Sequence, residues 1–435
     1  MAQRLEGRLG IEEAVRLLQA QLNTIGTSNR GDAFSKSLAL ADLLFAQRKF
    51  QQGFYFVGFA EKMRPQTKAV PALLEKIALP EMSGFIADTL SVDADFSYLW
   101  PDRRGGNVDY PLSMKVLNRC SILSGDLLLI DEEKRIVFES MHRLMRQPFV
   151  SPKLFSVYSR MFKTYRTKVG IDNPVIMTNR SQRNYCHFVL GNVAAILHAI
   201  KHVKENVKLT VFVDPHTRFV REYVELLGRL DSRLDFVEID KQTIYEAPEI
   251  LFSSCLVKKI VTNYPEIIPE FRRIAALCNE GEDRRERPAK LFLTRRNCRR
   301  SLADGDGVEG RLAQLGVTTI DPGDFPVAAQ VRMFEGAEQI VALHGAALTN
   351  LIYSVRNPSV FEIFTPNRTG NVTFKRLTLA MGGEYTTYSD LGVADAEKEL
   401  YQLSQPDDFY TAVEHFLSDG ANRQRVGEMS KKSDA

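Results

Sequence analysis

The 435-residue sequence has few of the features that mark several classes of protein. Its five cysteines are scattered, with no CxxC pair and no Cys/His spacing of a metal site, which predicts free thiols in a reducing compartment. No apolar run approaches about 18 residues, so the pattern predicts no membrane-spanning helix. The N-terminus lacks the apolar core of a signal peptide, and 57 Lys and Arg nearly balance 54 Asp and Glu. We therefore expect a cytoplasmic protein that does not bind nucleic acid.

The N-terminal part of the chain has a helical pattern. Apolar residues recur at helical spacing over residues 9–80. Residues 39–63 resemble a single tetratricopeptide-like hairpin, but such repeats are stable only when several of them stack. We interpret residues 1–85 as a helical extension that caps the next domain. Binding of a protein partner, or self-association, through these helices is the alternative.

Strands and helices alternate along the rest of the chain. After a hairpin at residues 125–138, the pattern predicts strands at residues 175–177, 209–213, 236–239, 291–293, 318–320, 340–343 and 359–364. Helices are predicted at residues 188–203, 219–230, 307–315, 327–336, 346–353 and 405–417. This alternation predicts an α/β protein with parallel, doubly wound sheets. The charged stretch 279–287 divides it into Rossmann-like domains at residues 86–280 and 281–425, followed by a disordered tail at 426–435.

The segment at residues 337–366 organises the second of these domains. A buried, partly β-branched strand ends at Leu343, and His344 and Gly345 follow it directly. Small residues let a ligand approach the backbone, and a helix that begins at Ala346 would direct free N–H groups toward the same edge. The next strand carries an acid, Glu362, in an apolar run. Taken alone, this pattern fits a ligand site and a locally satisfied buried His and Glu about equally well.

Two arginines follow the first strand of the same domain. Arg295 and Arg296 come at the carboxyl edge of a sheet, where α/β proteins bind nucleotides, and guanidinium groups suit phosphate oxygens. The alternative is a solvated arginine cluster that pairs with Glu282, Asp283 and Glu286. Residues 305–310 spell GxGxxG, but carboxylates occupy two of the variable positions and the first glycine lies far from the strand. We therefore expect a surface loop there, not a dinucleotide site.

Four segments, in order along the chain, resemble the motifs of one enzyme family. They are residues 184–188 (NYCHF), residues 290–296 (KLFLTRR), residues 330–334 (QVRMF), and residues 344–364 with HGAALTNLIY and VFEIF. Together they resemble glycosyltransferase family 61, and the resemblance covers residues 90–380. It implies a GT-B-like pair of Rossmann-like domains with the N-terminal α-helical extension left unexplained. It also implies a nucleotide-sugar donor and a glycan acceptor, which a lipid carrier can hold.

The resemblance places the donor on the second domain. Guanidinium groups and helix N–H groups can stabilise the charge of a departing diphosphate without a metal ion, and Glu362 can hold ribose hydroxyls. The predicted nucleotide-sugar-binding residues are Arg295, Arg296, His344, Gly345, Ala346, Thr349, Asn350 and Glu362. We expect no metal ligands and no cofactor other than the donor substrate. Asp304 and Asp306 spell a DxD motif, but they lie on the expected surface loop.

The acceptor side is predicted from the NYCHF segment. Asn184 and Tyr185 are candidate acceptor-side residues, and His187, near the opening of a helix, can take a proton from an acceptor hydroxyl. The family pattern carries an acid four residues after this histidine, where this chain has Gly191. Three hypotheses remain open: His187 acts without that carboxylate, Asp214 replaces it, or the chain is catalytically impaired.

Together, the residues and the resemblance favour an inverting, metal-independent glycosyltransferase of bacterial polysaccharide biosynthesis. Capsule and lipopolysaccharide are examples of the glycans that such enzymes build. Its expected location is the cytoplasm, with a peripheral position at the inner membrane left open. Polysaccharide pyruvyl transfer is one alternative, because those enzymes also carry an HGA-like turn at the end of a Rossmann strand. The other alternative is a degenerate, non-catalytic transferase that serves as a partner-binding module.

Overall fold

The structure is a computed structural model. It describes residues 10–25, 29–47, 50–64, 112–124, 127–133, 135–140, 167–240, 243–256, 265–281, 287–296, 300–366 and 368–418, with a few positions between 69 and 99. The predicted tail at residues 426–435 lies outside the described residues. So do the acids Glu282, Asp283 and Glu286, which the sequence offered as partners for the arginines.

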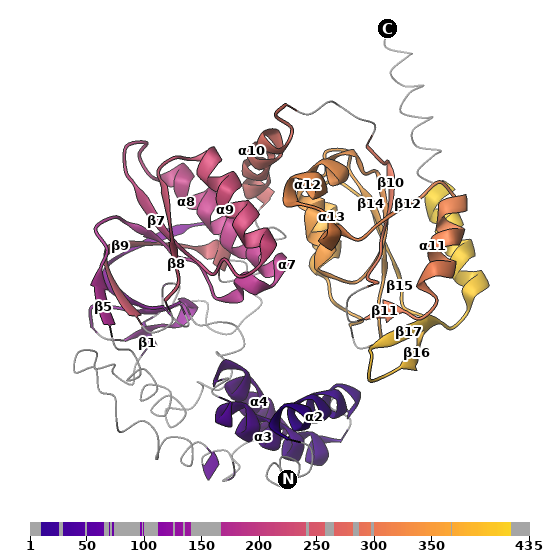
Figure 1. Cartoon of the computed structure of the whole chain (residues 1–435), viewed down its shortest axis with the longest axis horizontal. Coiled ribbons are helices and arrows are strands. Elements are labelled where there is room, and N and C mark those ends of the chain that lie inside the picture. Colours follow the sequence, from indigo (N-terminus) through magenta and orange to yellow (C-terminus); the bar gives the residue numbers. More distant parts are fainter. Residues whose placement is uncertain are drawn as a thin grey trace. The chain divides into compact units, whose positions relative to one another are not determined.

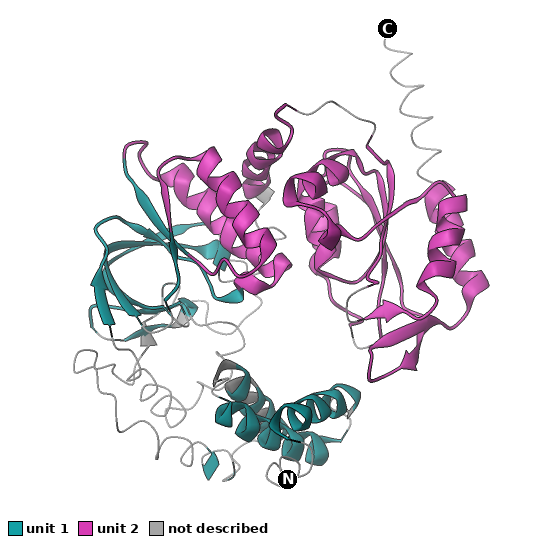
Figure 2. Cartoon of the chain, in the orientation of Figure 1, with its two compact units in different colours: residues 1–181, 207–212, 237–257 teal, residues 182–206, 213–236, 258–435 magenta. Residues whose placement is uncertain are grey.

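Two compact units divide the chain, and they are not simple halves of it (Figure 2). The first comprises residues 1–181, 207–212 and 237–257, and the second comprises residues 182–206, 213–236 and 258–435. The helices of residues 182–236 therefore group with the C-terminal sheet. The predicted domain boundary near residue 280 stays a prediction.

Three helices form the N-terminal part of the first unit: α2 (Ile11–Ile25), α3 (Arg30–Ala46) and α4 (Phe50–Met63). Their contact is apolar and includes Ala14, Leu18, Leu40 and Leu44, all fully buried. Asn29 caps α3, because its side chain accepts the N–H of Asp32 at 3.2 Å. The predicted N-terminal helices are thus confirmed up to residue 63.

A sheet of nine described strands carries the core of the first unit. Its order is β1-β4-β3-β2-β9-β6-β7-β8, with β5 also paired to β9. The described strands are β1 (Phe96–Ser97), β2 (Met114–Leu123), β3 (Leu128–Ile130), β4 (Ile136–Val137), β5 (Thr167–Gly170), β6 (Val175–Ile176), β7 (Leu209–Val213), β8 (Leu234–Glu238) and β9 (Thr243–Ser253). The predicted hairpin is confirmed, since β3 pairs with β4 in antiparallel fashion, and β6 is parallel to β7.

The long antiparallel pair β2 and β9 was not predicted. Glu246, Pro248 and Glu249 interrupt the apolar pattern of β9, and these three side chains are exposed. Opposite Pro248, Arg119 of β2 has a positive φ of 50°. A proline gives no N–H to a ladder, so the pair accommodates an irregular position there.

A five-stranded parallel sheet forms the centre of the second unit. Its strands are β10 (Lys290–Leu293), β12 (Thr318–Ile320), β13 (Gln339–Leu343), β14 (Ser359–Ile363) and β15 (Tyr385–Tyr388). Their order is β12-β10-β13-β14-β15, and every neighbouring pair is parallel. The predicted α/β class, with parallel sheets and N-terminal helices, is confirmed. The order reverses between β10 and β13, which makes this point the topological switch of the sheet.

Helices cover both faces of this sheet (Figure 1). Alternate strand residues such as Phe292, Val341 and Phe361 pack with α11 (Gly305–Gln314) and the helix at residues 406–418. The other face meets α12 (Val327–Gly336) and α13 (Thr373–Ala380), and the 3₁₀ helix η10 (Ala346–Tyr353) contacts both of these helices. A small sheet of β11 (Ser301–Leu302), β16 (Leu391–Asp395) and β17 (Leu400–Leu403) completes the unit.

The expectation of a surface loop at the GxGxxG segment was wrong. These residues form the first turns of α11, whose N-cap is Asp304, the acceptor of the Gly307 N–H at 3.2 Å. The reason is that carboxylates near a helix start are favourable, as caps and against the helix dipole.

Residues 182–206 and 213–236 of the second unit are largely helical. Helix α7 (Tyr185–His187) leads into a π-helical segment, η6 (Phe188–Val193), and then into α8 (Ala194–His202). The predicted helix at residues 188–203 therefore begins with a wider turn. Helix α9 (Arg218–Leu230) agrees with the helix predicted at residues 219–230. Helix α10 (Ile268–Cys278) belongs to the same unit and comes after the last segment of the first unit, which ends at residue 257. No helix among the described residues is long and apolar enough to cross a bilayer.

Candidate active site

Three neighbouring strands, β10, β13 and β14, bring most of the predicted donor residues to one edge. Parallel strands end at the same side of a sheet, so β10 delivers Arg295 and β13 delivers His344 and Gly345 to the carboxyl edge. β14 leads to a turn at residues 365–371 on the same side. Since β10 and β13 flank the topological switch, this edge is where a doubly wound sheet binds its ligand.

A buried carboxylate orients His344. Nδ1 of His344 lies 2.6 Å from Oε1 of Glu362, which is fully buried, and the Tyr385 hydroxyl donates to Oε2 of the same carboxylate. An ionised carboxylate only accepts, so Nδ1 carries the proton. Nε2 then points away from Glu362 and lies 3.3 Å from Nδ2 of Asn371. Phe364 stacks on the imidazole ring, with 5.1 Å between ring centroids, and fixes its plane.

Tyr385 is a permanent donor in this arrangement. Burial, and then the charge and hydrogen bond of Glu362, raise the pKa of Tyr385 above its usual range. Both oxygens of Glu362 are therefore engaged inside the protein. The prediction that Glu362 holds ribose hydroxyls stays a prediction.

The guanidinium of Arg295 packs against Gly345. Nη1 of Arg295 lies 3.5 Å from the carbonyl oxygen of His344, and a Cβ added at Gly345 would come within 1.8 Å of that nitrogen. The backbone of Gly345 is extended, with φ −178°, so the requirement for glycine comes from space and not from conformation. η10 begins at the next residue, Ala346, and its first N–H groups have no acceptor within the helix. The guanidinium cation of Arg295 and the first N–H groups of η10 thus meet at the carboxyl end of β13.

Arg296 is directed to a different place. Its Nε donates to Oε1 of Glu309 at 2.9 Å, and its Nη2 contacts Oε2 of Glu309 and, at 3.3 Å, Oδ1 of Asp306. Glu309 is buried and also accepts from the hydroxyl of Thr294 at 2.8 Å. The hydrogen bond from Arg296 lowers the pKa of the Glu309 carboxyl. The structure therefore separates two arginines that the sequence could not distinguish.

Thr349 and Asn350 lie inside η10, and both are fully buried. The Thr349 hydroxyl has no hydrogen-bond partner among the described residues. Both ends of the Asn350 amide are bonded: Nδ2 donates to Oε1 of Gln330 at 2.9 Å, and Oδ1 accepts from the Tyr185 hydroxyl at 2.5 Å. A direct role in binding the nucleotide stays a prediction for both residues.

A buried polar chain extends from Gln330 to Tyr353. Gln330 Nε2 donates to the carbonyl of Phe325, which fixes the orientation of its amide, so its Oε1 accepts from Asn350. Tyr185 therefore donates to Asn350, and the Tyr223 hydroxyl lies 3.3 Å from that of Tyr185 and 2.7 Å from that of Tyr353. Burial raises the pKa of all three tyrosines well above the usual range. The chain is therefore neutral and serves to hold groups in place.

This chain connects η10 to the turn that carries His187. Asn184 caps α7, because its side chain accepts the N–H of His187 at 3.2 Å, and His187 itself is partly exposed. The π-helical segment begins at the next residue, and π-helical turns are frequent at functional sites. Gly191, at the position of the family acid, is buried within that segment.

Asp214 belongs to a separate cluster of charged residues. Its Oδ2 accepts from Nε of Arg183 at 3.0 Å, and its Oδ1 lies 3.0 Å from Nδ1 of His216. The backbone N–H of Asp214 donates to Oε1 of Gln182 at 2.7 Å. The structure thus brings together Arg295, His344, Gly345, Ala346 and Glu362, and it connects Tyr185 to Asn350, whereas Arg296 and Asp214 have other partners.

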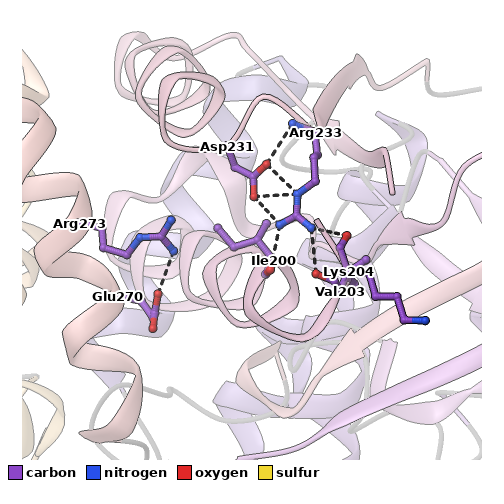
Figure 3. A network of polar contacts seen from close by, with 7 residues as sticks. All are labelled: Ile200, Val203, Lys204, Asp231, Arg233, Glu270 and Arg273. Atoms are coloured by element: carbon purple, nitrogen blue, oxygen red, sulfur yellow. Dashed lines mark hydrogen bonds and ion pairs between the residues drawn. The ribbon is translucent and has the colours of Figure 1, made fainter. Parts of the chain in front are cut away.

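The far end of α8 is held by Arg233 (Figure 3). Its guanidinium donates to the carbonyls of Ile200, Val203 and Lys204, at 3.0, 2.9 and 2.7 Å, and so binds one carbonyl in the last turn of the helix and two that follow it. Asp231 holds Arg233 from the other side, and that hydrogen bond lowers the pKa of Asp231. The helix that follows His187 is therefore anchored at both ends.

Several residues around this edge had no signal in the sequence. Asn371 and Tyr385 contact the His344–Glu362 pair, and Tyr223 and Tyr353 extend the buried chain. Asn371, Tyr385 and Tyr223 belong to no recognisable motif. Tyr353 closes the HGAALTNLIY segment and Gln330 lies within the QVRMF segment, so these two did have a signal. Among the described residues, no three His, Cys, Asp or Glu side chains gather as a metal site would require, and metal independence stays a prediction.

Comparison with known families identifies the chain. The family model described as Glycosyltransferase 61 matches residues 67–361, which is more than half of the 435 residues. The match includes the NYCHF, KLFLTRR, QVRMF and HGAALTN segments, and it ends one residue before Glu362. No curated protein matches the sequence. The chain belongs to glycosyltransferase family 61 and is a glycosyltransferase.

Proposed function

We propose that this glycosyltransferase is an inverting, metal-independent enzyme that moves a sugar from a nucleotide-sugar donor to a glycan acceptor. We place it in bacterial polysaccharide biosynthesis in the cytoplasm, with residues 86–280 and 281–425 as the two domains of a GT-B fold. The observation that carries the proposal is the packing of Arg295 against Gly345 and the His344 carbonyl, at the switch point of a parallel sheet. A guanidinium held at such an edge suits a diphosphate.

The donor side would work by stabilising the leaving group. When the bond between the anomeric carbon and the diphosphate oxygen breaks, negative charge grows on the diphosphate. Arg295 and the first N–H groups of η10 are fixed before the reaction, so they can stabilise that charge with little rearrangement. Glu362 keeps the proton of His344 on Nδ1 and leaves Nε2 to face the amide of Asn371. Arg296 would support this edge from behind, through Glu309.

The acceptor side would supply the base. The acceptor hydroxyl oxygen attacks the anomeric carbon from the face opposite the diphosphate, so a single displacement inverts the configuration. His187 takes the hydroxyl proton as the bond forms. Asp214 is the second candidate for this role. Asn184 and Tyr185 would act by fixing the turn that presents His187.

Two measurements test this function. Thermal shift with UDP, GDP, CDP and ADP should show stabilisation by at least one nucleotide, because a ligand that binds only the folded state raises the melting temperature. Transfer from the matching sugar nucleotide should continue in excess EDTA. Loss of turnover in EDTA, with recovery on adding manganese or magnesium, would contradict the metal-independent mechanism and direct attention to Asp304 and Asp306.

A non-catalytic role is the second candidate, and one observation favours it. Gly191, buried in the π-helical segment, stands where the family pattern has an acid. A chain that binds a nucleotide but transfers no sugar to any acceptor would support this candidate. Pyruvyl transfer is set aside, because the chain belongs to a glycosyltransferase family.

A further inference from the structure

Two arginines outside the family motifs lie at the edge that holds Arg295. Arg300 comes immediately before β11, and Arg368 lies in the turn that follows β14. β11 begins eight residues after β10 ends, and β16 begins three residues after β15 ends. The small sheet of β11, β17 and β16 therefore sits at the carboxyl edge of the five-stranded sheet.

The turn around Arg368 is a compact structure joined to His344. The N–H of Arg368 donates to the carbonyl of Thr365 at 2.9 Å, and the N–H of Asn371 donates to the carbonyl of Arg368 at 3.3 Å. The side chain of Asn371 then reaches Nε2 of His344. Arg368 is itself exposed, so its side chain stands at the open side of a turn that is fixed to the donor edge.

Arg300 is held in an uncommon backbone conformation. Its φ is +67°, which residues other than glycine adopt rarely, and such positions cluster at functional sites. The pairing of Ser301 with Leu400 places Arg300 beside Glu399, which has a φ of +52°. Neither Arg300 nor Arg368 forms an ion pair or a side-chain hydrogen bond with a described residue. Glu399 acts on Arg300 as a nearby charge.

The three guanidinium groups are close enough to affect one another. Burial, followed by the charges of Arg295 and Arg368, lowers the pKa of Arg300. The charges of Arg300 and Arg368 also act on the buried Tyr401 hydroxyl. An arginine remains cationic at neutral pH even with a lowered pKa, so three like charges gather here, with Glu399 as a carboxylate that acts on Arg300. A bound polyanion would offset that repulsion.

We propose that Arg300 and Arg368 join Arg295 to form a three-arginine site for the diphosphate of the donor, with Arg368 contacting the terminal phosphate. This inference rests on the proposed function, which places a diphosphate at the same edge. It adds two binding residues that the family motifs do not contain. It also predicts that the site distinguishes diphosphates from monophosphates, since only the longer anion can reach all three cations.

The test compares nucleoside diphosphate and monophosphate binding by isothermal titration calorimetry. The probe is the tightest of UDP, GDP, CDP and ADP, paired with its own monophosphate. Arg368→Ala should weaken binding of the diphosphate roughly 10-fold or more, which is the scale of a charged hydrogen bond. It should weaken binding of the monophosphate less than about threefold. Arg368→Lys should recover part of the loss. Arg300→Ala should act in the same direction, and its melting temperature shows whether it folds.

Arg356→Ala is the matched control. Arg356 precedes β14 and pairs with Glu338, so it lies at the amino edge of the same sheet. Its replacement by alanine removes the same charge far from the proposed site. Wild-type diphosphate affinity in Arg368→Ala would overturn the inference and leave the proposed function intact. Equal losses in Arg368→Ala and Arg356→Ala would overturn it too, because they would reflect net charge alone. A wild-type chain that binds none of the diphosphates would overturn the proposed function itself.

Discussion

His344 and His187 are held in contrasting ways. His344 is 8% exposed, with its ring fixed by Glu362, Asn371 and Phe364. His187 is partly exposed, and its backbone is held in place. Asn184 caps the turn by accepting the N–H of His187, and the hydroxyl of the nearby Tyr185 is bonded to Asn350. A ring held in one position suits a constant electrostatic role, whereas a more exposed ring suits proton transfer. The contrast supports the proposal that His344 serves the donor and His187 the acceptor.

The largest effect is expected at His187. His187→Gln removes the proposed base, so turnover should fall roughly 100- to 10,000-fold, while affinity for the nucleoside diphosphate stays within about twofold. Steady-state rates and calorimetry on the same sample measure both quantities. His415→Gln, exposed on the C-terminal helix, is the control. Full activity in a folded His187→Gln chain would remove this residue from the mechanism and make Asp214 the next acid to test.

Gly345→Ala should affect the donor side next most strongly. The added Cβ would occupy the position of Arg295 Nη1, and a long side chain can move aside without unfolding the protein. We expect roughly 10-fold weaker binding of the nucleoside diphosphate, with little change in melting temperature. Gly310→Ala in α11 is the control, because nothing lies within 4 Å of its added Cβ. Wild-type affinity in Gly345→Ala would show that the guanidinium need not lie against this glycine.

Glu362→Gln tests the anchoring of the His344 ring. The change leaves Nδ1 of His344 and the Tyr385 hydroxyl without a charged acceptor, so the free energy of unfolding should fall by about 1.5–3 kcal/mol. Tyr385→Phe, which removes one of the two donors, should cost about 1 kcal/mol. Urea unfolding of both variants, with the exposed Glu397→Gln as control, measures the difference. Unchanged stability in Glu362→Gln would mean that the pair does not fix His344.

Tyr353→Phe should have the smallest effect. It removes the last hydroxyl of the buried chain, so Tyr223 loses the shorter of its two hydroxyl contacts, at a cost of about 0.5–1.5 kcal/mol in unfolding free energy. Tyr185 keeps its bond to Asn350, so turnover should stay within about threefold. A fall in turnover as large as that of His187→Gln, in a folded chain, would show that the whole chain positions the base.

The sequence predicts regular elements well and long-range partners poorly. Apolar periodicity predicts every strand of the five-stranded sheet except β15, and helices such as α9, because those elements are buried in regular patterns, whereas no residue of β15 is fully buried. It fails for β9, where Pro248 and two glutamates interrupt the alternation. The interpretation of the GxGxxG segment as a surface loop also failed, because a cap and the ion pair of buried Glu309 with exposed Arg296 favour a helix there.

The candidate site follows the same division. Strand ends and small residues indicate His344, Gly345 and Arg295. Arg295 and Arg296 differ because Arg296 is bonded to Glu309, a residue of α11. No rule of sequence spacing predicts which of the two arginines makes that bond. Tyr185 and Asn350 are 165 residues apart, so only the folded chain shows that they are bonded. Arg300 and Arg368 likewise come to the edge through turns without a motif.

The central claim is that Arg295, and not Arg296, binds the diphosphate. Isothermal titration calorimetry of Arg295→Ala and Arg296→Ala with the tightest nucleoside diphosphate tests it most directly. Arg295→Ala should weaken binding by about 1.5–3 kcal/mol, whereas Arg296→Ala should stay within about twofold, because its guanidinium is already bonded to Glu309. Wild-type affinity in Arg295→Ala, or a larger loss in Arg296→Ala, would contradict the account.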